Sequence, residues 1–253
     1  MSVNQPVAKF VYKDKEIIYA VANDHTIWRV KSIWTKEPDT MAWIESMPEG
    51  DIFLDVGANM GIYSIFAAAR GLRVYAFEPE SSNYQLLCRS IMFNGFDQCT
   101  AYPVAISNVA RADVLYLSMM LPGGSCHTVG ENLDHRLEKR ESEIKQGCIS
   151  LPLDWFQIRP YAATDAEGNM KDHNLHIKID VDGLEHKVIQ GATETLSQAK
   201  SVLIEINQKL PEHMKMVDYM ESTGFRYDIS QVEKATRKEG TFKDCGNWIF
   251  YRK

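Results

Sequence analysis

The sequence has no apolar stretch approaching the ~20 residues that a membrane-spanning helix needs. It also has no charged N-terminal segment followed by a long apolar run, which is the pattern of a signal peptide. Lys and Arg number 28 against 34 Asp and Glu, and the net charge of −6 leaves no basic surplus to neutralise phosphates. We therefore expect a cytoplasmic protein that binds neither a membrane nor a nucleic acid.

Cysteine is scarce and scattered. The chain has five, an odd number, and no two of them form a C-x-x-C pair. The pattern predicts neither a disulfide framework nor a structural zinc site, and it favours reduced thiols.

One stretch, residues 51–80, carries most of the information. Ile52–Val56 is a short apolar run typical of a buried strand, and the turn 57–61 follows it directly. Residues 62–69 suit a tightly packed helix, 73–77 suit a second strand, and Glu78 stands at that strand's end. This order of strand, glycine turn, helix, strand and acid predicts a nucleotide-binding half of an open α/β sheet.

The residues of the turn indicate which nucleotide or nucleoside the protein binds. Gly57, Asn59 and Gly61 give G-x-N-x-G, which lacks the third glycine of the dinucleotide pattern G-x-G-x-x-G. Asp55, inside the strand end, can meet an ammonium group, and Glu78 can accept hydrogen bonds from a ribose diol. A ligand with an amino-acid head and a ribose but no phosphates fits best, and S-adenosyl-L-methionine is such a ligand.

A second stretch places acids at the same sheet edge. Residues 175–179 have the apolar alternation of a strand, and Asp180 and Asp182 follow them. Because ligands sit beyond the carboxyl ends of parallel strands, we expect Asp180 at the reaction centre, although Lys178 could simply pair with an acid. Asp180, Asp182 and His127, which follows a glycine-rich hinge, are the candidate general bases.

A divalent cation is a further hypothesis for this edge. Asp180, Glu205 and Asn207 end neighbouring predicted strands and offer oxygen ligands suited to Mg²⁺ or Ca²⁺. Such an ion would lower the pKa of an acceptor hydroxyl directly.

Two segments do not follow the alternation of strands and helices. Residues 1–50 predict an N-terminal extension with a hairpin and a helix that could cover the pocket, with Glu37 near the cofactor. Residues 51–253 then form one domain, in which Ala105 lies beside the expected adenine. Residues 118–150 are an insertion expected to shape the acceptor pocket, and the charged part, 131–144, suggests a solvated helix or a mobile lid.

The motifs resemble a known family. Residues 55–61 (DVGANMG), 76–79 (AFEP) and 177–183 (IKIDVDG), with Gly191-Ala192 downstream, are similar to the FkbM family of S-adenosylmethionine-dependent methyltransferases. The resemblance implies a seven-stranded Rossmann-like sheet with helices on both faces, and O-methylation of a hydroxyl on a sugar or secondary metabolite. It also implies that Asp55, Gly57, Asn59, Gly61 and Glu78 bind the cofactor, with Asp180 near the transferred methyl. Asp182 is a departure, because the family often has Glu there.

Two other functional classes remain open. One is an NAD-dependent or nucleotide-sugar redox enzyme, and the other is a non-catalytic protein that binds an adenosyl ligand. The expected partner is a small-molecule or glycan acceptor, and the sequence is compatible with a homo-oligomer.

Overall fold

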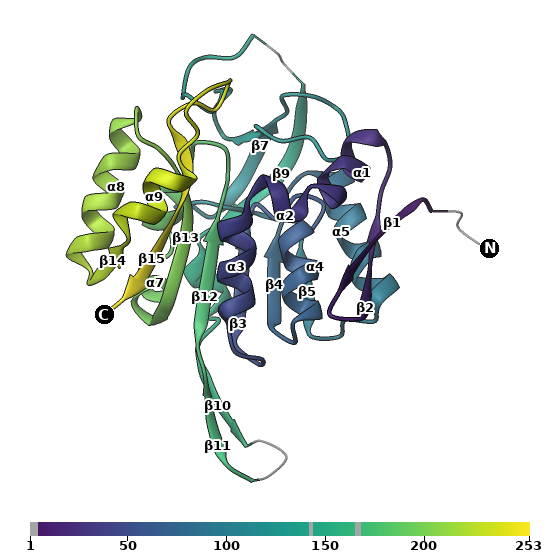
Figure 1. Ribbon diagram of the computed structural model, residues 1–253. Coiled ribbons are helices and arrows are strands. Elements are labelled where there is room, and N and C mark those ends of the chain that lie inside the picture. The colour runs from purple at the N-terminus through teal and green to yellow at the C-terminus, as the bar shows by residue number, and fades with distance from the viewer. Residues whose placement is uncertain (1–4, 142–143, 165–167) are drawn as a thin grey trace.

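A seven-stranded sheet forms the centre of the computed structural model, which describes residues 5–141, 144–164 and 168–253. The strand order is β14-β15-β13-β12-β3-β4-β5 (Figure 1). β15 runs antiparallel to both of its neighbours, and the other pairings are parallel. The strands are β3 (Ile52–Val56), β4 (Arg73–Phe77), β5 (Cys99–Tyr102), β12 (Leu175–Ile179), β13 (Ala199–Asn207), β14 (Phe225–Tyr227) and β15 (Cys245–Arg252).

The strand order reverses between β3 and β12, the two central strands. β3 continues in sequence towards β4 on one side, whereas β12 continues towards β13 on the other. Connections therefore leave in opposite directions and open a crevice beyond the carboxyl ends, which is where open α/β sheets bind ligands. Gly57, Glu78 and Asp180 directly follow β3, β4 and β12, so all three lie at this edge.

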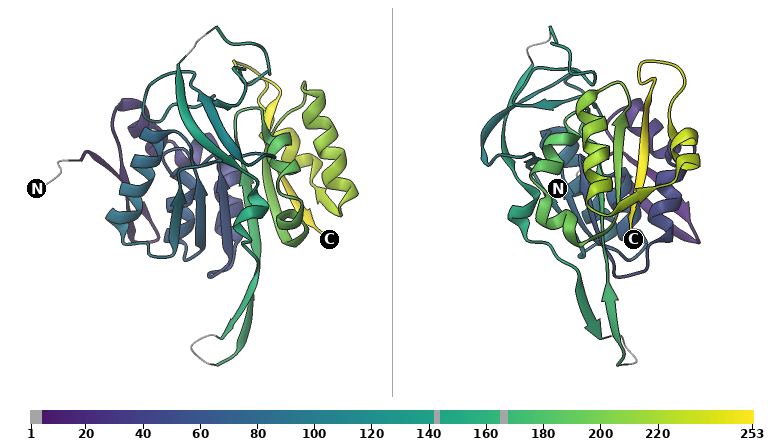
Figure 2. Two further views of the ribbon diagram at one scale, coloured as in Figure 1. Left: turned by 180° about the vertical axis from the view of Figure 1, so that it is seen from behind. Right: turned by 90° about the vertical axis from the view of Figure 1, so that its left-hand side faces the viewer.

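Apolar side chains fill both faces of the sheet. Along β3, Phe53 packs into one core, while Ile52, Leu54 and Val56 pack into the other, as the alternation of a strand requires. One core is covered by α3 (Pro38–Ser46), α4 (Ile62–Ala69) and α5 (Ser81–Asn94). The other is covered by α6 (Glu185–Gln190), α7 (Thr193–Gln198) and α8 (Pro211–Ser222), as Figure 2 shows from two further sides. The predicted α/β architecture is confirmed.

The N-terminal segment contains the expected hairpin, β1 (Val7–Tyr12) with β2 (Lys15–Ala20), and the expected helix, α3. It also contains α1 (Asp24–Lys31) and α2 (Ile33–Lys36), which the sequence analysis did not predict. Asn23 begins α1 with a capping box, since its Oδ1 accepts a hydrogen bond from the backbone N–H of Thr26 at 2.9 Å.

The insertion supplies β8 and most of β9 to a second sheet of order β6-β9-β7-β8, and of the two expectations for 131–144, a solvated helix or a mobile lid, the helix is wrong. These strands are β6 (Ala105–Ile106), β7 (Arg111–Tyr116), β8 (Thr128–Val129) and β9 (Lys145–Leu151). The described part of 131–144 consists of turns around one bridge between Leu133 and Lys139. Asp134 explains the turn, because its Oδ1 accepts the N–H groups of Arg136 and Glu138 at 2.8 and 3.0 Å. Residues 142–143 lie outside the described part.

The remaining elements lie at the margins of the main sheet. The hairpin β10 (Tyr161–Thr164) and β11 (Met170–His173) projects from the edge opposite the crevice (Figure 1). A short 3₁₀ helix spans Leu153–Phe156, and α9 (Ile229–Ala235) packs near β15. Among the described residues no helix combines the length and apolar character required to cross a bilayer.

Candidate functional site

The glycine turn after β3 brings two strand ends together. Gly57 has φ +81°, and its N–H donates to the carbonyl oxygen of Phe77 at 3.0 Å. A Cβ built on Gly57 would lie 1.9 Å from the carbonyl oxygen of Asp180. Only glycine permits both this backbone conformation and this close approach of β3 to β12. The turn is therefore a requirement of the fold at the crevice.

The first pocket at this edge is an apolar slot that ends in a carboxylate. About 630 Å³ of unfilled space lies between Gly57, Asn59, Glu78 and the start of β6. The apolar lining residues are Phe77, Ala105, Ile106, Leu115, Val129, Val181 and Leu184. The structure thus places Gly57, Asn59, Glu78 and Ala105 around one pocket, as the sequence analysis expected of cofactor residues.

Glu78 is held in this pocket by backbone groups. One carboxylate oxygen accepts the N–H of Asn59 at 2.7 Å, and the other accepts the N–H of Glu80 at 2.9 Å. Burial raises the pKa of Glu78 to about 8, since its side chain is almost completely removed from water. Each oxygen keeps a second lone pair, so the carboxyl group can still bind hydroxyl groups of a ligand.

We predict that Glu78→Gln separates binding from stability. The folded state holds the Glu78 proton up to about pH 8, whereas the unfolded chain releases it near pH 4.5. The wild type therefore loses stability as pH rises between these values, and the glutamine does not. We expect the unfolding free energy of Glu78→Gln to stay level between about pH 5 and about pH 8, where that of the wild type falls, although the amide nitrogen cannot accept the N–H of Asn59 or Glu80. Binding of S-adenosylhomocysteine should weaken about tenfold. Urea unfolding and calorimetry measure the two effects, and the exposed Glu212→Gln should change neither.

Asn59 serves mainly to hold the insertion over the pocket. Its Nδ2 donates to the carbonyl oxygen of Gly124 at 2.6 Å, and Asn83 Nδ2 donates to the same oxygen at 3.1 Å. Asn83 Oδ1 also accepts the N–H of Gly123 at 2.7 Å. The glycine-rich turn of the insertion is thus fixed against α5 and the β3 turn, and it forms one wall of the pocket. Asn83 was missed by the sequence analysis, because nothing in the composition of α5 indicates that it meets residue 124.

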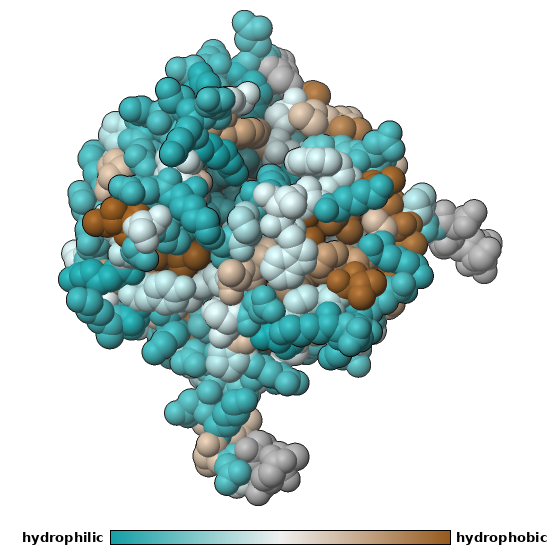
Figure 3. All heavy atoms as spheres, viewed as in Figure 1, coloured by the Kyte–Doolittle hydropathy of each residue, from teal (hydrophilic) through white to brown (hydrophobic). Residues whose placement is uncertain are grey.

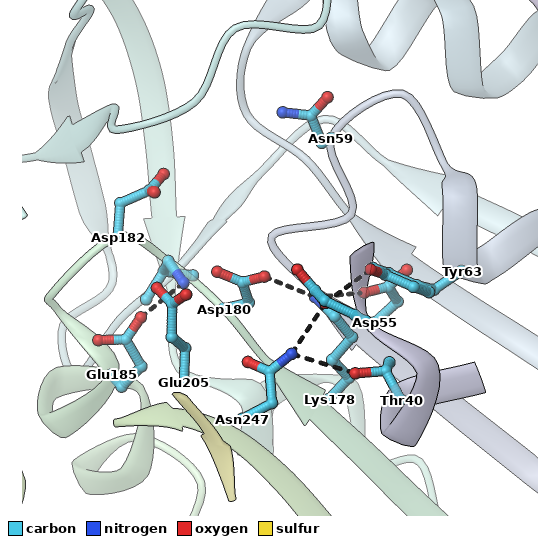
Figure 4. A network of polar contacts seen from close by, with 12 residues as sticks. Thr40, Asp55, Asn59, Tyr63, Lys178, Asp180, Asp182, Glu185, Glu205 and Asn247 are labelled. Atoms are coloured by element: carbon cyan, nitrogen blue, oxygen red, sulfur yellow. Dashed lines mark hydrogen bonds and ion pairs between the residues drawn. The ribbon is translucent and has the colours of Figure 1, made fainter. Parts of the chain in front are cut away.

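Asp55 does not lie where the sequence analysis placed it. Its side chain is fully buried and lines neither the first pocket nor the wider cleft that adjoins this pocket. One oxygen accepts a hydrogen bond from Ser64 Oγ at 2.6 Å, and the other lies 3.6 Å from Lys178 Nζ (Figure 4). The Lys178 ammonium therefore occupies the position expected for the ammonium group of a ligand. The reason is the register of β3 and β12, which sets Asp55 directly beside Lys178.

We predict that Asp55→Asn affects stability and not cofactor affinity. The substitution leaves Lys178 with Asp180 and removes one buried charge partner, so the unfolding free energy should fall by about 1–3 kcal/mol. The affinity for S-adenosylhomocysteine should stay within about threefold of wild type, because Asp55 does not reach the pocket. Glu78→Gln, in contrast, should lose affinity. A tenfold loss of affinity in Asp55→Asn measured by calorimetry would restore the ammonium-binding role.

Gly61 also acts locally. It begins α4 with φ +87°, and a Cβ there would lie 2.5 Å from Leu87 Cδ1. Gly61 does not line the pocket, so the structure gives it a role in packing α4 against α5 rather than in direct contact with a ligand.

A second, wider cleft adjoins the first pocket. It encloses about 1000 Å³ of unfilled space and shares Gly57, Asn59, Ser125, Asp180 and Asp182 with the first pocket. Its other lining residues are Trp28, Arg29, Lys36, Glu37, Ala58, Ile62, Tyr63, Lys178, Glu205, Arg237 and Phe242. Figure 3 shows the hollow among hydrophilic side chains in the upper half of this face. The two spaces meet at the acids that follow β12.

The two acids after β12 differ in their partners. Asp180 accepts a hydrogen bond from Lys178 Nζ at 3.1 Å. Although burial alone would lower the pKa of Lys178, the charges of Asp180, Asp55 and Glu37 raise it, and the ammonium stays charged. In the described part of the chain Asp182 contacts Cys126, whose N–H donates to it at 2.7 Å and whose thiol also interacts with it, and burial and the Asp180 charge raise the pKa of Asp182 to about 7. Figure 4 shows Asp182 apart from the Lys178–Asp180 pair, and its raised pKa makes it a candidate for proton exchange near neutral pH.

His127 and Glu37 line different spaces at this edge. His127 lines the first pocket and not the wider cleft, and burial lowers its pKa to about 4. Its Nδ1 accepts the N–H of Ser118 at 3.2 Å, so His127 is a neutral ring beside the slot. Glu37 lines the wider cleft and not the slot. Its Oε2 accepts hydrogen bonds from Tyr63 Oη at 2.6 Å and Asn247 Nδ2 at 2.8 Å.

Three acids form a cluster beyond the strand ends, and its third member is Glu185 in place of the expected Asn207. Carboxylate oxygens of Asp180, Glu185 and Glu205 lie within 4.8 Å of one another. Asn207 is engaged locally, since its Oδ1 accepts the N–H of Lys209 at 3.0 Å. The donor set fits a metal poorly, because its members already have partners.

Of the three acids in the cluster, Glu185 has the most partners. It accepts the N–H of Val181 at 2.8 Å and that of Gly183 at 3.0 Å, and it lies 3.2 Å from His213 Nε2. Glu205 pairs with Arg237 at 3.0 Å. The divalent cation stays a prediction, and none of the steps proposed below uses one.

Comparison with known sequences matches residues 55–227 to the family described as "Methyltransferase FkbM domain". Methyltransferase sdnD of Sordaria araneosa is 22% identical over 242 residues, covering 90% of this chain and 92% of that protein. Hexuronic acid methyltransferase AglP of Haloferax volcanii is 20% identical over 192 residues, covering 75% of this chain and 70% of that protein. Among solved structures, magnesium protoporphyrin IX methyltransferase (ChlM) from Synechocystis PCC 6803 aligns with a TM-score of 0.49 at 10% identity, over 92% of this chain and 86% of that one.

Proposed function

The chain belongs to the FkbM methyltransferase family, and we propose that it transfers a methyl group from S-adenosyl-L-methionine to a hydroxyl oxygen of a sugar or small metabolite. The observation that carries the proposal is the junction of the two spaces. An apolar slot ending at Glu78 meets, at Asp180 and Asp182, a wider cleft lined by charged and aromatic side chains. We infer that the cofactor and a second molecule meet there.

The slot suits an adenosyl group. Ala105 and Ile106 offer an apolar surface to a base, and Glu78 lies near Gly57 where a ribose diol would need hydrogen-bond acceptors. Asn59 fixes the wall formed by the insertion. When bound, S-adenosyl-L-methionine supplies an electrophilic methyl carbon on a sulfonium, so the protein's task is chiefly to orient the acceptor. Such orientation contributes up to ~7–11 kcal/mol to lowering the barrier.

Asp182 is the residue best placed to take the acceptor's proton. It lines both spaces, has no cationic partner among the described residues, and has a pKa raised to about 7. A base with a pKa near the working pH is the most effective proton acceptor. The Asp182 carboxylate would take the hydroxyl proton as the acceptor oxygen bonds to the methyl carbon, while the bond from that carbon to sulfur would break and leave the neutral thioether of S-adenosylhomocysteine. Asp180 pairs with Lys178 at 3.1 Å and would face a positive ligand group nearby.

Two relatives bear on the acceptor. AglP is named as a hexuronic acid methyltransferase, and sdnD is named as a methyltransferase. A sugar derivative is thus an acceptor of at least one protein with recognisable similarity to most of this chain. The charged side chains that line the wider cleft support the same class.

Calorimetry followed by a transfer assay tests the proposal. We expect the purified protein to bind S-adenosylhomocysteine and not NADH. We also expect it to transfer the methyl group of S-adenosyl-L-methionine to a hydroxyl of a sugar or small alcohol, detected by mass spectrometry. Binding of NADH in place of S-adenosylhomocysteine would favour the redox alternative. Binding without transfer to any member of a broad hydroxyl panel would favour the non-catalytic binder.

A further inference from the structure

The charged side chains of the wider cleft are paired, with two exceptions. Four cationic and four acidic side chains line it. The shortest contacts pair Lys178 with Asp180 at 3.1 Å, Arg237 with Glu205 at 3.0 Å, and Lys36 with Glu37 at 3.2 Å. Arg29 and Asp182 remain; Arg29 is near enough to counteract the rise in the Asp182 pKa, but neither forms an ion pair with any residue in the described part of the chain. Arg29 is therefore the cation that this cleft leaves for a ligand.

Arg29 is held in position through one side of its guanidinium. Its Nε lies 3.2 Å from His25 Nε2, which in turn lies 3.1 Å from the carbonyl oxygen of Gly123. A Cβ on Gly123 would lie 3.8 Å from Arg29 Cδ, so the arginine stem packs along the turn that closes the first pocket. Within residues 5–141, 144–164 and 168–253, its two terminal nitrogens meet no hydrogen-bond acceptor. The guanidinium is thus held at Nε, while its two terminal nitrogens have no acceptor among the described residues.

Aromatic side chains stand beside this cation. Trp28 and Phe242 line the same cleft, and Trp28 is half exposed. The His25 ring stacks on Trp28 with a centroid separation of 5.8 Å, which fixes the indole near the arginine. A planar guanidinium binds a carboxylate through two parallel hydrogen bonds, and an aromatic face packs against a sugar or an apolar ring.

We propose that Arg29 binds a carboxylate in the wider cleft, and that this carboxylate belongs to the methyl acceptor. The proposal rests on the proposed function and adds a substrate class to it: a hydroxyl compound that also carries a carboxylate. Arg29 lines the wider cleft and not the slot that suits the adenosyl group, which favours the acceptor as the source. The other source of the same chemistry is the amino-acid carboxylate of the cofactor.

Binding of matched probes tests this proposal. Protein saturated with S-adenosylhomocysteine is titrated with methyl β-D-glucuronide and methyl β-D-glucoside, and with 4-hydroxybenzoate and 4-hydroxybenzamide. We expect at least one carboxylate probe to bind tighter than its neutral counterpart. Arg29→Gln should weaken that binding about 10- to 100-fold, and Arg29→Lys should restore part of it. Lys31→Gln, which removes the same charge from the same helix outside the cleft, should have no effect.

A second arm identifies the source of the carboxylate. The affinities of each variant for S-adenosylhomocysteine and for 5′-methylthioadenosine, which lacks the amino-acid carboxylate, are compared. Equal affinities in wild type and Arg29→Gln support the acceptor assignment. A loss for S-adenosylhomocysteine alone overturns it, because Arg29 would then bind the cofactor. Failure of every carboxylate probe to bind tighter than its neutral counterpart also overturns it, while wild-type binding of S-adenosylhomocysteine leaves the proposed function standing.

Discussion

Gly57→Ala should abolish measurable binding of S-adenosylhomocysteine, a loss of at least about 100-fold. A methyl group there would lie 1.9 Å from the carbonyl oxygen of Asp180, closer than any non-bonded contact allows. The φ of +81° adds a further cost of about 1–2 kcal/mol for a residue with a Cβ. β3 and β12 would have to separate at the crevice, and the wall shared by the slot and the cleft would shift.

Calorimetry and thermal unfolding measure the two consequences, and Gly147→Ala is the matched control. Gly147 lies in β9 without a positive φ, and a Cβ there would meet no heavy atom within 4 Å. The control should keep its affinity and melting temperature. A Gly57→Ala protein that binds S-adenosylhomocysteine within tenfold of wild type would show that the crevice tolerates this movement, and the pocket assignment would be wrong.

Asp182→Asn should lower kcat by about 10²–10⁴-fold, the range that a positioned general base contributes. Asparagine keeps an oxygen that can accept the N–H of Cys126, so the turn after β12 should survive. The affinity for S-adenosylhomocysteine should change little, and Asp97→Asn on the surface should have no effect on either quantity. Loss of affinity equal to the loss of rate would point to a structural role in place of catalysis.

The pH dependence provides an independent check on Asp182. A general base must be deprotonated to act, and burial together with the Asp180 charge raises the Asp182 pKa to about 7. We therefore expect kcat/KM to rise with pH through about 7 and to level off above it. In Asp182→Asn this rise should disappear from the residual activity. A wild-type profile that is flat from pH 5.5 to 8.5 would contradict the assignment.

Local sequence patterns determined the catalytic framework of this protein. The run from Ile52 to Glu78 predicted β3, the turn, α4 and β4, because apolar alternation, glycine and helix-forming residues act over a few neighbours. The same run placed Gly57 and Glu78 on one pocket, since consecutive parallel strands end at the same edge.

The tertiary structure alone decided which charges are available to a ligand. Asp55 appeared free in the sequence, but the β3–β12 register sets it beside Lys178, more than a hundred residues later in the chain. The sequence did not indicate a binding role for Arg29, because its neighbours in α1 do not reveal that Gly123 and Asp182 lie near it. Strand and turn formation depends on adjacent residues, whereas the pairing of charges depends on distances between segments that only the folded chain brings together.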